Sequence, residues 1–128
     1  MSLIDCDLHI ECDMSCNGGY GYAALTRHVK WPGTPAVGMT FTGDADMSPP
    51  LRVVSIDFTY KDDGVIRNSL QVSLEGFDSW VRLISREYVC GKPMFERVIR
   101  AMLADGWTIF DDVVWTSTQA TTEIIESS

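Results

Sequence analysis

The chain has 128 residues, a length that suits a single domain. Hydrophobic residues make up 45% of the chain, enough to form a packed core, which excludes a disordered protein. The formal net charge is −8, from 10 basic and 18 acidic residues. This balance excludes a general nucleic-acid binder, because such proteins need a basic surface.

The sequence predicts neither a membrane span nor a secretory signal. No apolar run approaches the roughly 18 residues of a membrane helix. The chain does not open with a cationic segment followed by an apolar one, as a secretory signal does. We therefore expect a cytoplasmic protein that does not bind membranes.

Residues 3–14 predict the strand on which the sheet is built. Apolar and polar side chains alternate along it, which is typical of a half-buried strand because successive side chains leave opposite faces. We expect its polar face to be exposed to solvent, since burial of four carboxylates would be prohibitively costly. The side chains predicted on that face are Asp5, Asp7, His9, Glu11 and Asp13.

Asp5 and Asp7 are the first candidates for chemistry. Two residues of strand rise place their Cα atoms about 6.6 Å apart, a spacing that suits a divalent metal or an acid–base pair. Either role needs a third convergent group, and His9 is the nearest candidate. A solvated strand face explains the same residues, and no Ser-His-Asp or Cys-His arrangement stands out. We predict no catalytic site, no metal and no cofactor.

The four cysteines predict buried, reduced thiols. Cys6 and Cys12 share a strand face but lie about 20 Å apart, too far for a disulfide. Cys16 does not form a CxxC motif with Cys12, and Cys90 is isolated in the sequence. A zinc site is the alternative, although His9 faces away from the cysteines of its strand.

Residues 15–22 predict a flexible loop because glycines occupy positions 18, 19 and 21. The run lacks the motifs of a phosphate loop or a dinucleotide site. Tyr20 and Tyr22 are candidates for partner binding, because tyrosine provides contact area at low entropic cost. Residues 23–31 fit a short helix or an irregular segment. Together with the glycine-rich run before them they form the predicted loop region, residues 18–31.

The remaining elements follow from periodicity. Strands are predicted at 36–43, 51–60, 65–75 and 107–115, with a tight turn at 61–64. Helical spacing predicts helices near 77–89 and 93–105, although a strand through 80–89 is an alternative. Gly106 fits the position that ends the second helix, and Trp107 is expected to fold back on its last turn. A mostly polar tail begins near residue 116 and is expected to fray.

These elements predict one α+β domain over residues 1–128. An antiparallel sheet of about five strands would pack one face against the two helices. Small, acidic α+β chains without a catalytic set are common among immunity proteins and phage-encoded inhibitors of host defence. This similarity of type involves no motif, but it favours a non-enzymatic protein whose acidic face binds a basic protein partner.

Two other functions compete with this interpretation. The protein could be a structural subunit of a phage or another self-assembling complex, joined to its copies through sheet edges and the tail. It could also bind a small molecule where the loop region 18–31 meets the sheet, with Tyr20, Tyr22, Arg27 and His28 around the ligand.

Overall fold

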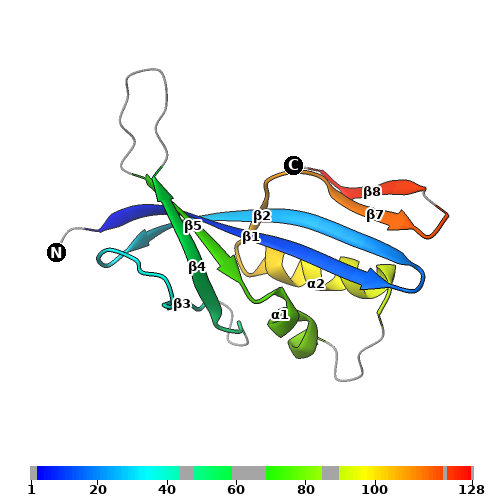
Figure 1. Ribbon diagram of the computed structural model, residues 1–128, viewed down its shortest axis with the longest axis horizontal. Helices are drawn as coiled ribbons and strands as arrows, with labels where there is room; N and C mark the ends of the chain where they lie inside the picture. The colour runs from blue at the N-terminus through cyan, green and yellow to red at the C-terminus, as the bar shows by residue number, and fades with distance from the viewer. Residues whose placement is uncertain (1–2, 44–47, 59–68, 85–89, 120, 128) are drawn as a thin grey trace, which may run out of the picture.

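The computed structural model describes residues 3–43, 48–58, 69–84, 90–119 and 121–127. They form the predicted α+β fold, in which a curved, mixed sheet carries two helices (Figure 1). The helices are α1 (Phe77–Ile84) and α2 (Lys92–Ala104). The strands are β1 (Ile4–Cys16), β2 (Gly19–Trp31), β3 (Thr40–Phe41), β4 (Leu51–Phe58), β5 (Ser69–Glu75), β6 (Thr108–Ile109), β7 (Val113–Ser117) and β8 (Thr122–Glu126). Their order across the sheet is β3-β4-β5-β1-β2-β7-β8, and β6 pairs with β2 outside this path.

The long hairpin of β1 and β2 is the centre of the sheet. Every residue of β1 pairs with a residue of β2, from Ile4 opposite Trp31 to Cys16 opposite Gly19. The predicted first strand is therefore confirmed, and it occupies the middle of the strand order. The predicted loop at 18–31 is wrong, because β2 begins at Gly19 directly after a two-residue turn.

The sheet is mixed and larger than the predicted antiparallel sheet of about five strands. β5 runs parallel to β1, whereas the other pairs are antiparallel. The predicted strand at 36–43 shortens to β3, and the predicted closing strand divides into β6 and β7. The tail expected to fray instead forms β8, which pairs with β7. The tight turn predicted at 61–64 lies outside the described residues.

Both helices pack on the face of the sheet that carries the apolar side chains of β1. The even-numbered residues of that strand, from Cys6 to Met14, are all buried, as their alternation predicted. On α2 the buried stripe consists of Phe95, Val98, Ile99 and Met102. The alternative of a strand through residues 80–89 is wrong as far as Ile84, because α1 is helical up to that residue. Residues 85–89 lie outside the described part of the chain.

The end of α2 follows the predicted capping pattern. Gly106 has a φ of 114°, the left-handed region in which glycine is favoured. The chain then folds back, and the backbone N–H of Trp107 donates to the carbonyl oxygen of Met102 at 3.2 Å. The indole of Trp107 is buried and meets the Phe41 ring edge to face, with centroids 6.3 Å apart.

Two glycines of β2 allow close packing on this strand, Gly21 under α2 and Gly19 beside β7. A Cβ atom at Gly21 would lie 2.8 Å from atoms of the Phe95 ring, well inside van der Waals contact. A Cβ atom at Gly19 would lie 2.7 Å from Nε1 of Trp115. Gly21 is therefore needed for close packing under α2 and Gly19 for close packing against β7, and neither serves the mobility of a loop.

The cysteine prediction is half wrong. Cys6 and Cys12 are free and buried, as expected. Cys16 and Cys90, however, form a disulfide with Cα atoms 5.7 Å apart. The 74 residues that separate them in the sequence concealed this pair, because spacing along a chain does not reveal contacts between distant elements.

No helix of the described ranges is long and apolar enough to cross a membrane.

Candidate functional site

The six residues predicted to bind a partner lie on one face of the sheet. We call the side opposite the helices the outer face. The odd-numbered residues of β1 point to it, and so do the even-numbered residues of β2. The register places Asp13 opposite Tyr22 and Ser15 opposite Tyr20. The predicted residues that the hairpin thus brings to the outer face are Asp5, Asp7, Glu11, Asp13, Tyr20 and Tyr22.

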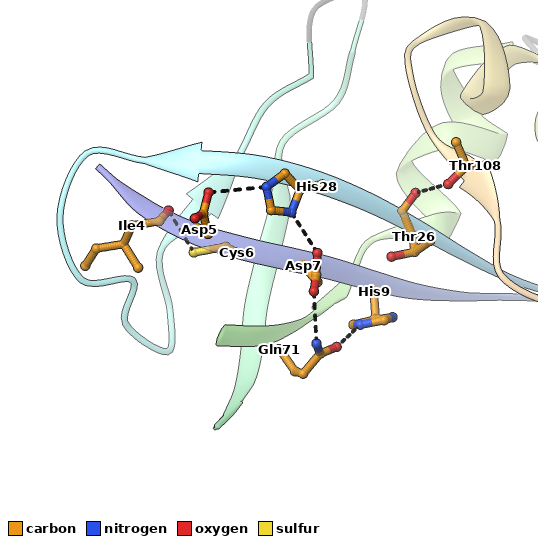
Figure 2. Close-up of polar contacts among 9 residues, drawn as sticks. All are labelled: Ile4, Asp5, Cys6, Asp7, His9, Thr26, His28, Gln71 and Thr108. Atoms are coloured by element: carbon orange, nitrogen blue, oxygen red, sulfur yellow. Dashed lines mark hydrogen bonds and ion pairs between the residues drawn. The ribbon is translucent and has the colours of Figure 1, made fainter. Parts of the chain in front are cut away.

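A chain of polar contacts crosses three strands at one end of the outer face (Figure 2). His28 of β2 lies between two carboxylates of β1, with Nδ1 2.9 Å from Asp7 Oδ1 and Nε2 3.3 Å from Asp5 Oδ1. On β5, Gln71 donates from Nε2 to Asp7 Oδ2 at 3.1 Å. The Oε1 atom of Gln71 in turn contacts Nε2 of His9. Two strands that flank β1 therefore bind its carboxylates.

His28 has a raised pKa within this chain of contacts. The hydrogen bond to Asp7 raises the pKa of His28 most, and the nearby charges of Asp7 and Asp5 add to that effect. A histidine that donates from both ring nitrogens is the charged imidazolium. The side chain is 56% exposed, so the effect on stability is reduced by solvent screening.

The four carboxylates predicted on the polar face of the first strand form a row along β1 that is divided into two halves, Asp5 with Asp7 and Glu11 with Asp13. In the half with Asp5 and Asp7, the register also places Lys30 opposite Asp5. Solvent reaches 49% of the Asp5 side chain and 33% of that of Asp7. The first 26 residues lack Lys and Arg, but β2 supplies His28 and Lys30 from outside that stretch. This half of the row is partly neutralised.

The other half of the row borders a concavity of about 940 Å³ on the outer face. Side chains of β1, β2, β4, β5, the start of α1 and the segment after β6 line it. None of the described residues that line it is Lys or Arg, although Arg52 pairs with Glu75 at 2.9 Å. Its carboxylates are Glu11, Asp13, Glu75, Asp78 and Asp111.

Aromatic side chains complete the concavity. Phe110 is 63% exposed, and its ring meets the edge of His9 with centroids 5.8 Å apart. Its backbone N–H donates to the carbonyl oxygen of Ala24 at 2.9 Å, which fixes the segment beside β2. Burial and the charge of Glu11 raise the pKa of Tyr22, so its phenol stays a neutral donor at physiological pH. Exposed, well-positioned aromatic residues of this kind commonly anchor partners.

Sequence reasoning missed several members of this surface. Asp78, Phe110 and Asp111 come from separate elements, and nothing in their local sequence associates them with β1. Among the missed carboxylates, only Glu75 had a local sequence signal: it alternates with apolar residues in its strand, which predicts that it points away from the core. Convergence of these residues depends on the strand order, which the sequence pattern does not specify.

The alternative ligand site around residues 18–31 is wrong in its composition. Arg27 faces the core side of β2, whereas His28 faces the outer side. The guanidinium of Arg27 donates to the backbone oxygen of Asp105 at 2.7 Å and lies 5.4 Å from the Phe41 ring centroid. Arg27 and His28 therefore cannot surround one ligand.

The outer face is suited to binding cations. Its carboxylates are acceptors, and its two histidines contact Gln71 and carboxylates. Within the described ranges, no group of three or more His, Cys, Asp or Glu residues is arranged to hold a metal ion. Such a surface suits ammonium or guanidinium groups of a partner.

Comparison with known proteins returns no match: no family model fits the chain, and no curated protein or solved structure is significantly similar to it.

Proposed function

We propose that this protein is a non-enzymatic binding protein of the inhibitor or immunity type, which engages a basic protein partner through its outer face. The observation that carries this proposal is the acidic concavity, whose described lining contains five carboxylates and no Lys or Arg. The contact surface would centre on Glu11, Asp13, Tyr22 and Phe110.

The sheet gives such a surface two physical advantages. Strands hold the carboxylates at fixed spacings, so less conformational entropy is lost on binding than with an acidic tail. A concave acidic surface also concentrates the electrostatic field, which speeds the approach of a basic partner. An inhibitor of this kind could occupy a basic groove in place of nucleic-acid phosphates.

Binding of an arginine-rich peptide tests the proposal without knowledge of the natural partner. In the double variant Glu11→Gln with Asp13→Asn, we expect the affinity to fall by roughly 1–3 kcal/mol, as measured by calorimetry. Both residues are exposed, so the melting temperature should stay nearly unchanged. Raising the salt concentration should slow association of the unmodified protein.

A charge-matched control is available on the helix side of the sheet. Glu123 and Glu126 pair with Lys92 and Arg100 of α2, at 2.5 and 3.4 Å respectively. The double variant Glu123→Gln with Glu126→Gln removes the same charge and should keep the peptide affinity. Equal losses of peptide affinity in both double variants would show that binding depends only on the net charge of the protein, and would overturn the proposed site.

A second candidate is the structural subunit of a phage or other self-assembling complex. The observation in its favour is β8, which ends the strand order and carries an exposed Ile124. A strand at a sheet edge can add a strand from another copy. Light scattering separates the candidates: a monomer at all concentrations supports the binding protein, and a ring or filament supports the subunit.

A further inference from the structure

We propose that the Cys16–Cys90 disulfide is a redox modification site, which an external dithiol reduces selectively and whose reduction lowers the stability of the protein without unfolding it. This inference is independent of the proposed partner. It rests on where the disulfide lies, on the inaccessibility of the two other thiols, and on the contacts that remain after reduction.

The disulfide connects two elements that meet at one end of the hairpin. Cys16 is the last residue of β1, and Cys90 lies two residues before the start of α2. At that end of α2, Gly91 provides no side-chain cap. The crosslink thus fixes the beginning of an uncapped helix to the end of the central strand.

Only this cysteine pair is open to exchange with an external thiol. Cys16 and Cys90 are half-buried, whereas Cys6 and Cys12 have no exposed surface. Burial raises the pKa of the Cys12 thiol strongly, so it forms almost no thiolate, the species that attacks disulfides. Four residues of strand rise also separate Cys12 from Cys16 by about 13 Å, which prevents internal exchange.

The reaction is an ordinary thiol–disulfide exchange. A thiolate of the external dithiol attacks one sulfur of the pair and forms a mixed disulfide, while the other sulfur leaves as a thiolate and takes up a proton. The second thiol of the reagent then displaces the remaining protein sulfur. Two electrons and two protons pass to Cys16 and Cys90, and the dithiol becomes a disulfide.

Contacts other than the disulfide hold the reduced protein together. Phe95 of α2 packs on Gly21, and its ring centroid lies 6.1 Å from that of Trp115. The ammonium of Lys92 pairs with Glu123 at 2.5 Å. Reduction removes the constraint on a loop of more than 70 residues, a length at which a crosslink restricts the unfolded chain strongly.

Thermal unfolding with and without dithiothreitol tests this inference. We expect the reductant to lower the melting temperature of the wild-type protein by about 5–15 °C. The double variant Cys16→Ser with Cys90→Ser should match the reduced protein and should not respond to the reductant. If that variant does not fold, reduced wild-type protein still provides the comparison.

Alkylation of the folded protein with iodoacetamide tests selectivity. Mass spectrometry should find no modified cysteine before reduction, and modification only of Cys16 and Cys90 after it. An unchanged melting temperature in fully reduced protein would overturn the stabilising role. Modification of Cys6 or Cys12 in the folded state would overturn the selectivity, and two free thiols at Cys16 and Cys90 in air-oxidised protein would overturn the site itself.

Discussion

At the residue scale, Gly21 determines how closely α2 approaches the sheet. Its Cβ position would lie 2.8 Å from the Phe95 ring, and that ring is fully buried between β2 and its neighbours. We expect Gly21→Ala to lower the free energy of unfolding by about 1–3 kcal/mol, because an overpacked core must shift side chains or backbone. Urea denaturation measures this loss.

Gly18 provides the control for that substitution. It lies in the turn of the same hairpin, and nothing lies within 4 Å of a Cβ atom built there. Gly18→Ala should therefore change the stability by no more than about 0.5 kcal/mol. Equal losses in the two variants would show that hairpin flexibility, and not contact with Phe95, explains the glycines.

His28 makes a second prediction at this scale. Its pKa is raised in the folded protein, mainly by the hydrogen bond to Asp7. The stabilisation that it contributes is thus complete below the unfolded-state pKa of about 6.5 and is lost as the pH rises through the folded-state pKa. In an NMR titration, Asp7→Asn should lower the pKa of His28. A pKa that stays unchanged in this variant would show that Asp7 does not stabilise the imidazolium.

At the scale of elements, a buried ion pair connects β2 to the end of α2. The guanidinium of Arg27 lies 3.5 Å from the carboxylate of Asp105, and both side chains are buried. Ser48 donates to the same carboxylate at 2.8 Å. We expect Asp105→Asn to lower the free energy of unfolding by about 3 kcal/mol, since it leaves a buried guanidinium without its counter-charge.

Chemical denaturation of this variant checks the prediction, and Asp112→Asn serves as a control that removes the same charge beyond the helix. A loss below about 1 kcal/mol in Asp105→Asn would show that the carboxylate adds little to the backbone hydrogen bond, which the substitution leaves in place.

Elements with a strong apolar period could be predicted from the sequence, and those without one could not. β1 and α2 have apolar side chains at regular positions and were predicted nearly to their ends. β2 also alternates, but its core face contains Gly19, Gly21 and Arg27. The two glycines and the buried arginine concealed the alternation, because each packs against a partner distant in the sequence: Gly21 against α2, Gly19 against β7, and Arg27 against Asp105.

At the scale of the whole molecule, the outer face is a product of strand order. The sequence predicted the carboxylates of β1 and the two tyrosines of β2 as separate candidates, and the register brought them together. It could not predict the approach of Phe110 or the pairing of His28 with Asp7. Side-chain period determines the face of each residue, but strand order and register determine its neighbours.

The most direct test of the account is to map the binding of an arginine-rich peptide by chemical-shift changes in ¹⁵N-labelled protein at low salt. We predict that the largest changes occur at Glu11, Asp13, Tyr22 and Phe110, and that they disappear as salt is added. Backbone amides of Glu123 and Glu126, on the helix side, should change little. Changes centred on β8, or spread evenly over every acidic residue, would contradict the assignment of the outer face as the binding surface.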